Sequence, residues 1–330
     1  MKAVGLLSGG LDSALAIKLI LNENIKVYAF NFITPFYSHS LEKEYWPKRQ
    51  AEQLGIPIKY SHADEEYLHI VKNPKHGYGR NVNPCIDCRI HMLKKAKEYM
   101  KTIGASFIVT GEVVGQRPSS QKKSDLNLID KESGLEGLVL RPLSAKLLPQ
   151  TIPEEKGWVK RENLLAIKGR SRKVQMKLAE AIGIKEYATP AGGCLLTEPG
   201  FAAKFKDLIN YNPNPNFRDI ELLKIGRHFR ISSAKIVVGR EASENKQLES
   251  LAQEGDWLFQ VEGYTGPIVL AQGELSENSI PQISQITVRY SDAPKKEPIK
   301  VKYVTVGKDN QNFTFATAID DNSLKKIRIG

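Results

Sequence analysis

The stretch Ala3–Asn24, AVGLLSGGLDSALAIKLILNEN, decides the fold class. Its apolar start, Ala3–Leu7, predicts a short buried strand, and leucines spaced by four from Leu11 onward predict a helix. Between them lies Ser8–Ser13, SGGLDS. A helix start directs unpaired N–H groups and a positive dipole end at an anion. The stretch therefore predicts a phosphate-binding loop between a strand and a helix.

Each polar residue of this loop has a predicted role. Ser8 and Ser13 can donate hydroxyl hydrogen bonds to a phosphate, and Gly9 and Gly10 let the backbone turn tightly and come close to it. Asp12 can hold Mg²⁺ against the phosphates. The loop lacks the G-x-x-x-x-G-K-[ST] pattern of the Walker loop.

Strand and helix patterns alternate through the first half of the chain. Such alternation predicts an α/β fold, a Rossmann-like parallel sheet with helices on both faces. The helix near residues 40–54 contains Pro47, which should kink it or start a second segment. The remaining predicted elements are strands at 26–32, 57–60 and 107–110 and a helix at about 89–102.

The chain has 330 residues, a length that suggests about two domains. Tyr211–Asn216, YNPNPN, is typical of a linker. We therefore expect a catalytic domain at 1–205 and a smaller α+β domain at 211–330. Three β-branched runs predict strands in the second domain, at 235–238, 267–270 and 299–304.

Charge and hydropathy exclude some classes of protein. With 48 Lys and Arg against 37 Asp and Glu, the net charge is +11, which suggests an anionic partner. We see no targeting segment and no apolar run long enough to cross a membrane, so a cytoplasmic enzyme is expected. The sequence does not indicate an oligomeric state.

One basic stretch, residues 156–177, has eight Lys or Arg residues and one acid. It is either a solvated helix face or a track for RNA phosphates. Five of its residues are candidate RNA contacts: Lys160, Arg161, Arg170, Arg172 and Lys173.

All three cysteines lie in turn-like segments marked by Gly or Pro. Cys85 and Cys88 belong to NPCIDC, and Cys194 to AGGC. This placement leaves three functional hypotheses and an inert one. The thiolates can hold a [4Fe–4S] cluster with one iron open, Cys88 and Cys194 can form a persulfide and disulfide pair, or His91 can complete a structural zinc site.

The Ser8–Ser13 motif resembles the PP-loop of the N-type ATP pyrophosphatases. That resemblance implies cleavage of ATP between its α and β phosphates, with adenylation of a substrate oxygen. It also implies that adenine lies near Phe30 and near Gly111, so 111–117 is an expected active-site loop. Arg117 is a candidate phosphate contact or an ordinary surface arginine.

NPCxxC after a PP-loop resembles the tRNA thiouridine synthases, in which residues placed like Cys88 and Cys194 act together. The extra Cys85 resembles the iron–sulfur-dependent group of that family. The resemblance implies an ATP-dependent tRNA-uridine sulfurtransferase that uses ATP, Mg²⁺ and a [4Fe–4S] cluster. Its sulfur would come from sulfide or a cysteine desulfurase.

A second resemblance lies in the C-terminal part. RHFRI at 227–231 and IVVGREASEN at 236–245 are similar to the NFACT-R RNA-binding domain. Arg227, Arg230 and Arg240 are candidate phosphate contacts. Phe229 either stacks on a base or lies in the core.

We therefore predict an enzyme that adenylates a tRNA uridine carbonyl and replaces its oxygen with sulfur. Asp12, Cys88 and Cys194 are the expected catalytic residues. Three alternatives remain: a persulfide mechanism without a cluster, an ATP pyrophosphatase that ligates or amidates a small metabolite, and a non-catalytic RNA-binding protein. The modified position, carbon 2 or carbon 4, is not predicted.

Overall fold

The computed structural model describes residues 1–37, 42–185, 187–188, 193–276, 278–309 and 311–330. It divides into two compact units, Met1–Thr197 and Glu198–Gly330. The division precedes the expected break near 211 because helix α8, Pro199–Tyr211, packs on the next helix and on the final strand. No helix among the described residues is long and apolar enough to cross a membrane.

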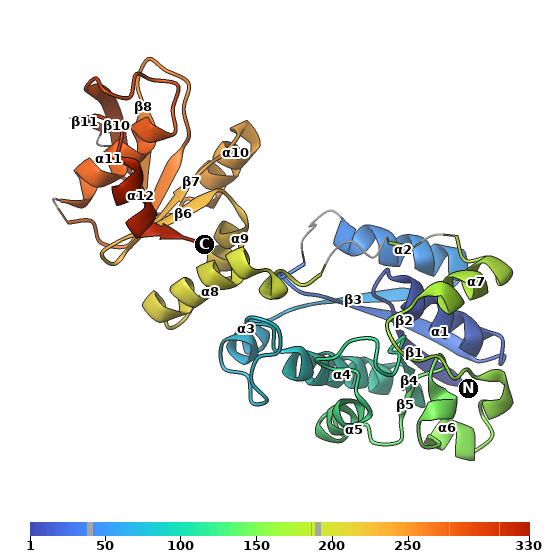
Figure 1. Ribbon diagram of the computed structural model, residues 1–330. Helices are drawn as coiled ribbons and strands as arrows, with labels where there is room; N and C mark the ends of the chain where they lie inside the picture. Colours follow the sequence, from blue (N-terminus) through green and yellow to red (C-terminus); the bar gives the residue numbers. More distant parts are fainter. Residues whose placement is uncertain (38–41, 186, 189–192, 277, 310) are drawn as a thin grey trace. The chain divides into compact units, whose positions relative to one another are not determined.

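The first unit is built on a five-stranded sheet in the order β3-β2-β1-β4-β5 (Figure 1). Every neighbouring pair is parallel, which confirms the predicted fold class. The strands are β1 Lys2–Leu6, β2 Lys26–Ile33, β3 Ile58–His62, β4 Phe107–Val109 and β5 Val139–Leu140. The sequence patterns missed β5, since two residues are too few to show a period.

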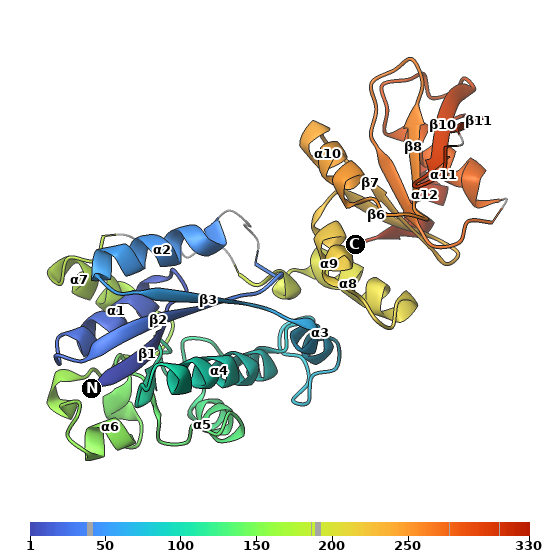
Figure 2. The same ribbon diagram turned by 180° about the vertical axis from the view of Figure 1, so that it is seen from behind.

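Helices cover both faces of this sheet (Figures 1 and 2). Ala3 of β1 belongs to the core that includes α1 and α7, and Val4 to the opposite core with α4 and α5. The helices are α1 Leu11–Leu21, α2 Glu42–Leu54, α3 Glu65–Lys72, α4 Cys85–Thr102, α5 Lys123–Glu132, α6 Ile152–Glu155 and α7 Lys173–Ala181. Short 3₁₀ turns lie at Ala145–Leu147, Arg161–Asn163 and Leu195–Thr197.

Two local features of the first unit need comment. Helix α2 continues through Pro47, so the proline does not start a second segment. Gly5 is required in β1 because a Cβ there would lie 2.7 Å from the Ile17 side chain. Helix α1 therefore packs close to the strand that leads into the phosphate loop.

The second unit contains a seven-stranded antiparallel sheet in the order β11-β10-β8-β9-β7-β6-β12. Helix α11 packs on one face, and α9 and α10 on the other. The strands are β6 Arg227–Ile231, β7 Ala234–Val238, β8 Trp257–Val261, β9 Val269–Gln272, β10 Ile299–Thr305, β11 Gln311–Ala316 and β12 Arg328–Ile329. The remaining helices are α9 Phe217–Lys224, α10 Ala242–Leu251, α11 Ser279–Arg289 and α12 Asp321–Ile327. This α+β unit agrees with the predicted class of the C-terminal domain.

Candidate phosphate loop and thiol site

The phosphate loop joins β1 to α1 in a conformation that only glycine accommodates. Gly9 has φ +83°, and a Cβ there would lie 2.8 Å from Trp46 Cβ and 3.0 Å from Pro47 Cδ. Helix α2 thus covers the loop on this side. Gln50, also on α2, donates from Nε2 to the Gly9 carbonyl at 3.1 Å. Sequence patterns gave no reason to single out this buried glutamine.

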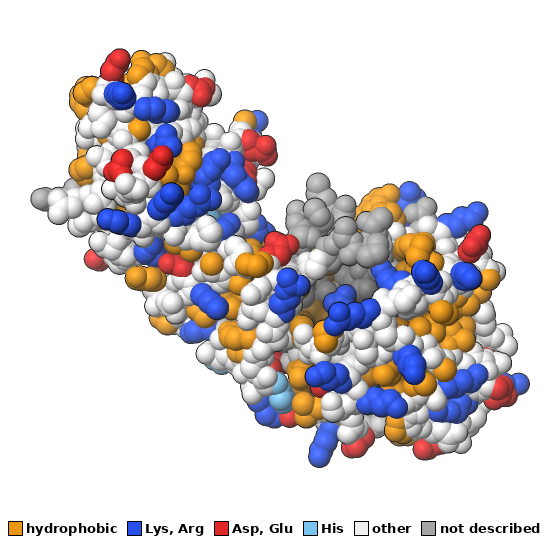
Figure 3. All heavy atoms as spheres, in the orientation of Figure 1, with side chains coloured by type: hydrophobic (Ala, Val, Ile, Leu, Met, Phe, Trp, Pro, Cys, Tyr) orange, Lys and Arg blue, Asp and Glu red, His pale blue; other side chains and the backbone are white. Residues whose placement is uncertain are grey.

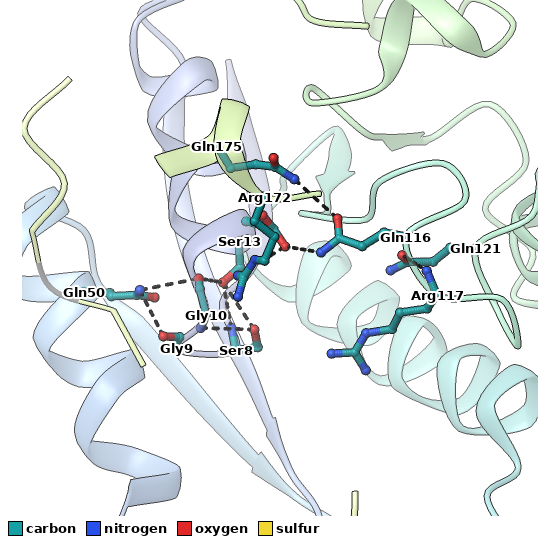
Figure 4. Close-up of polar contacts among 11 residues, drawn as sticks. Ser8, Gly9, Gly10, Ser13, Gln50, Gln116, Arg117, Gln121, Arg172 and Gln175 are labelled. Atoms are coloured by element: carbon teal, nitrogen blue, oxygen red, sulfur yellow. Dashed lines mark hydrogen bonds and ion pairs between the residues drawn. The ribbon is translucent and has the colours of Figure 1, made fainter. Parts of the chain in front are cut away.

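The loop hydroxyls are held in place by the loop itself (Figure 4). Ser13 Oγ donates to the Gly10 carbonyl at 2.8 Å and accepts the Ser8 N–H at 3.3 Å. Ser8 Oγ lies 3.3 Å from Ser13 Oγ and accepts the Gly10 N–H at 3.4 Å. The hydroxyls and amides converge on one spot at the start of α1, an arrangement suited to a phosphate.

Asp12 lies beside this spot, and one of its two carboxylate oxygens contacts neighbouring side chains. Its Oδ2 accepts from Gln116 Nε2 at 2.8 Å and lies 3.5 Å from Arg172 Nη2. Its Oδ1 is buried and has no hydrogen-bond partner among the described residues. A carboxylate oxygen that is buried and unpaired suits Mg²⁺, which binds through one or two carboxylates and substrate phosphates.

Gly111 follows β4 and lies directly against the loop. A Cβ at Gly111 would be 2.5 Å from the backbone carbon of Asp12 and from the backbone nitrogen of Ser13. The structure thus brings segment 111–117 to the phosphate loop, and an ATP contact at Gly111 stays a prediction.

Phe30 needs a correction as an ATP-binding side chain. It is 2% exposed, packs with Ile90 and Leu93 of α4, and stacks on Tyr99 at 5.8 Å. Its ring therefore belongs to the core under α4 and is closed to an adenine.

Arg172 also needs a correction, because the sequence placed it on an RNA track. Its guanidinium faces Asp12, and its Nε is buried without a hydrogen-bond partner among the described residues. Gln175, one turn further along α7, donates to Gln116 Oε1 at 3.4 Å. Figure 4 shows Arg172, Gln116 and Gln175 converging on the phosphate loop. Arg172 thus lies beside the phosphate loop.

The three cysteines come together from two distant segments. Cys85 and Cys88 form the first turn of α4. Cys194 pairs with Tyr37 in an antiparallel bridge after β2, and the Leu196 carbonyl accepts the N–H of Val82 at 3.2 Å. The charge of Cys88 raises the pKa of both Cys85 and Cys194, which indicates that the thiols lie near one another. Ala191 and Gly192 of the predicted motif lie outside the described residues.

Burial dominates the acidity of these thiols. It raises the pKa of Cys85, with a further contribution from Cys88, and raises the pKa of Cys88. Burial and then Cys88 raise the pKa of Cys194 to about 12. The buried thiols therefore favour their protonated form unless positive charge balances them, as a bound metal centre does.

Tyr67 and His91 line the thiol site without completing a zinc site. Tyr67, which the sequence reasoning missed, is buried, and its hydroxyl lies 3.3 Å from Cys88 Sγ. The His91 nitrogens face Asp64 and Glu66 instead of the thiols. Among described residues, the three sulfurs do not all lie within 4.8 Å of one another. Thiolates that share one zinc stand roughly 3.8 Å apart, whereas cluster ligands bind different irons and stand further apart.

A buried ion network ties the phosphate loop to the thiol helix. Glu112 follows Gly111, is 4% exposed, and accepts from Arg141 Nε at 3.0 Å. Its other oxygen lies 3.6 Å from Nε of Arg89, the residue after Cys88. Burial opposes ionisation, but Arg141 and Arg89 hold the pKa of Glu112 below its usual value. Arg141 also pairs with Asp130 at 2.7 Å, so the network is balanced.

The remaining residues of the predicted RNA track divide into two groups. Lys160, Arg170 and Lys173 are exposed. Arg161 is committed to the fold, because it pairs with Glu154 at 2.5 Å and donates to two main-chain carbonyls. Its role as an RNA contact stays a prediction, since its guanidinium already has these partners. Figure 3 shows further Lys and Arg side chains spread over one face of the first unit.

In the second unit, two predicted RNA contacts have structural partners. Arg230 pairs with Asp207 and lies 4.0 Å from the Tyr211 ring centre. Arg227 lies over the Tyr290 ring at 4.7 Å. Phe229 is fully buried. Of its two expected roles, it therefore has the one in the core, because its ring has no exposed face on which a base could stack.

A group of cations lies nearby in this unit. Burial, followed by the charges of Arg240 and Lys235, lowers the pKa of Lys204 to about 8. Figure 3 shows basic side chains gathered over the β7 and α10 part of the unit. Crowded positive charge with too few carboxylates favours an anionic ligand.

Both parts of the chain match known families, which confirms the two resemblances found in the sequence. Residues 1–146 match the family described as thiamine biosynthesis protein (ThiI). Residues 226–328 match the NFACT protein RNA binding domain. The first unit is thus an α/β unit with a strand–loop–helix start, and the second is an α+β unit that matches a different family model.

Curated relatives resemble the first unit. A probable tRNA sulfurtransferase of Lysinibacillus sphaericus is 31% identical over 144 residues, 43% of this chain and 34% of the relative. A probable tRNA sulfurtransferase of Thermococcus kodakarensis is 28% identical over 147 residues, 43% of this chain and 36% of the relative. The chain thus spans about one third of the length of these relatives.

A solved structure also resembles the chain. The protein in the crystal structure of a 4-thiouridine synthetase–RNA complex with bound ATP is 22% identical to this chain. The match covers 68% of this chain and 52% of that chain. The TM-score is 0.37, too low to establish a shared overall arrangement.

Proposed function

We propose that the protein is an ATP-dependent tRNA-uridine sulfurtransferase. The observation that supports it most is the presence of a phosphate loop and three converging thiols in one unit. Ala188 donates its N–H to the Gly9 carbonyl at 3.0 Å, and Cys194 lies six positions further along the chain. Six residues span at most roughly 20 Å, so the loop and the thiols serve neighbouring parts of one site.

The proposed reaction begins with ATP on the phosphate loop. Ser8, Ser13 and the amides of the loop hold its phosphates, and Arg172 neutralises charge that develops on the leaving pyrophosphate. Asp12 would hold Mg²⁺, which supplies charge neutralisation at the phosphates when bound. The uridine carbonyl oxygen attacks the α-phosphorus, the bond to the β-phosphate oxygen breaks, and pyrophosphate leaves.

The second half of the reaction exchanges oxygen for sulfur. Hydrosulfide attacks the activated carbon, the carbon–oxygen bond breaks, and AMP leaves with that oxygen. The sum is uridine, ATP and hydrosulfide giving thiouridine, AMP and pyrophosphate. The residues around the thiols, including buried Tyr67, exclude water. Water would otherwise attack the activated carbon and regenerate uridine.

We further propose that Cys85, Cys88 and Cys194 hold a [4Fe–4S] cluster. Three thiols in one unit, two of which have a pKa raised by the charge of Cys88, fit this donor set. When bound, the cluster would offer its unligated iron to the incoming sulfide. Anaerobically purified protein should be brown and contain about four irons per chain. Colourless protein with stoichiometric zinc would contradict the cluster.

The second unit and the exposed cations of the first are proposed to hold the tRNA. Support comes from the RNA-binding family match and from the cation group around Lys204. A sulfide source or a cysteine desulfurase would supply the sulfur. Deletion of the second unit should weaken tRNA affinity, and unchanged affinity would remove this role.

Mass spectrometry of nucleosides tests the function itself. tRNA is incubated anaerobically with iron-reconstituted protein, ATP, Mg²⁺ and sulfide, then digested. We expect a nucleoside 16 mass units heavier than uridine, and its retention distinguishes carbon 2 from carbon 4. Adenylation without any thiolated nucleoside would favour the ligase or amidase alternative.

A further inference from the structure

A second cluster of ligand-type side chains lies beside the thiol site. Asp64, Glu66 and His91 each place one ligand atom so that all three atoms lie within 4.8 Å of one another. Asp64 is the N-cap of α3, Glu66 lies in its first turn, and His91 lies one turn beyond Cys88 on α4. The cluster therefore joins two helices that contact each other.

His91 is the member that indicates a ligand. It is 2% exposed, and its Nε2 has no hydrogen-bond partner among the described residues. That nitrogen lies 3.6 Å from Asp64 Oδ1, and Nδ1 lies 4.0 Å from Glu66 Oε2. Both distances are too long for hydrogen bonds. A buried polar nitrogen without a partner is costly, so this one requires an explanation.

Lys95 shows that the two carboxylates attract a cation. Its Nζ lies 2.8 Å from Asp64 Oδ2 and 3.7 Å from Glu66 Oε2. The ammonium pairs with the two carboxylates, and among the described residues it makes no hydrogen bond to His91 Nε2. The pair is partly exposed, and such pairs are weak enough for a stronger cation to displace the lysine.

We propose that Asp64, Glu66 and His91 form a binding site for a divalent first-row transition ion such as Zn²⁺. One imidazole and two carboxylates are a donor set that such ions accept, with water completing the shell. Ligand atoms around one ion lie roughly 3 Å apart, so side chains whose ligand atoms lie within 4.8 Å need to close by less than about 2 Å. The ion would give His91 Nε2 its missing partner.

The ion would also support the thiol site through Tyr67. This residue follows Glu66, and its ring lies 5.6 Å from the His91 ring. Its hydroxyl reaches Cys88 Sγ. Binding would clamp the start of α3 to α4 and fix Tyr67 against the thiol. The proposal does not depend on the proposed function, since it rests on these ligands alone.

The test compares Zn²⁺ binding by the unchanged 330-residue chain and a His91→Phe variant after chelator treatment. Phenylalanine keeps the ring contacts with Phe32 and Tyr67 but offers no ligand. Because both proteins keep the three thiols, the difference in bound Zn²⁺ reports only on His91. Calorimetry should show one equivalent more in the unchanged chain, and equal stoichiometries would overturn the proposal.

A second pair of variants keeps the test valid if His91→Phe fails to fold. Glu66→Gln should weaken Zn²⁺ binding at least tenfold, whereas Glu65→Gln, an exposed neighbour on α3, should leave it unchanged. Lys95→Met removes the competing ammonium and should tighten binding roughly two- to fivefold. Equal effects of the two glutamate variants, or weaker binding by Lys95→Met, would overturn the site.

Discussion

The phosphate loop and the thiol site are built in opposite ways. The loop is local: Ser8–Ser13 supplies the hydroxyls, amides and carboxylate within six consecutive residues. The thiol site is assembled across the fold, because the segment of Cys194 is held near Cys85 and Cys88 by the bridge to Tyr37 and by the hydrogen bond from Val82 to Leu196. A local site should survive changes elsewhere, whereas an assembled site should fail when any contributing segment is altered.

The largest expected effect is a loss of thiolation, and one substitution in each site should cause it in a different way. Cys194→Ser should lower thiolation at least 10³-fold and reduce bound iron, while ATP affinity stays within twofold because the loop is intact. Asp12→Asn should lower thiolation about 10²–10⁴-fold while iron content is kept, since it removes charge from the predicted Mg²⁺ ligand. Iron content, ATP binding and nucleoside analysis of both variants measure this.

Loss of ATP affinity in Cys194→Ser would contradict the separation. So would loss of iron in Asp12→Asn.

The next effect concerns the buried network that joins the two sites. Arg141→Leu removes the nearest cation from buried Glu112, which keeps Arg89 at 3.6 Å, and removes the paired guanidinium of half-buried Asp130, so unfolding of the first unit should become easier by about 3 kcal/mol. Lys75→Met, which removes a pair whose lysine is 69% exposed, should cost at most about 1 kcal/mol. Denaturant titration of both variants measures the difference, and similar losses would refute the network's role.

Arg172 offers a smaller effect with a neighbour as its control. Arg172→Gln removes a charged contact to the predicted phosphate site, so KM for ATP should rise roughly 10–100-fold. Lys173 is an exposed neighbour, and Lys173→Gln should leave the KM for ATP unchanged. It should reduce the slope of log tRNA affinity against log salt concentration by roughly one, because one phosphate contact is lost. Steady-state kinetics and binding at several salt concentrations distinguish the two. A raised KM in Lys173→Gln alone would reverse these assignments.

The smallest effect is a pH dependence in the second unit. Lys204, with a pKa of about 8, is charged below that pH and loses its charge above it. RNA affinity should therefore fall by a fewfold as pH rises from 7 to 9, since one cation near a phosphate is lost. Fluorescence anisotropy measures this, and Lys204→Arg should flatten the curve. A steep fall that persists in Lys204→Arg would assign the effect to another group.

The difference between the sites also explains what the sequence could predict. The parallel sheet, the phosphate loop and the importance of all three cysteines follow from local patterns around Ser8, Cys85 and Cys194. Partners supplied by distant segments do not. Gln50, Tyr67 and Arg141 have no local motif and gain their roles only when helices and strand ends meet.

Charge patterns in the sequence predicted the roles of individual residues less well than the motifs did. Arg161 and Arg172 lie in the same basic stretch, yet one pairs with Glu154 and the other faces Asp12. Sequence alone does not distinguish them, because a carboxylate partner far along the chain determines each orientation. Phe30 shows the same limit. It lies on the strand where an adenine contact was expected, but its side chain points into the core under α4.

The ratio of AMP formed to thiouridine formed tests the central claim most directly. It is measured in one turnover with iron-reconstituted protein, tRNA, ATP, Mg²⁺ and sulfide under anaerobic conditions. If the phosphate loop and the three thiols serve one reaction, the ratio is one, and Cys194→Ser yields no thiouridine. AMP release that continues at the same rate without tRNA, with no thiolated nucleoside, would contradict it.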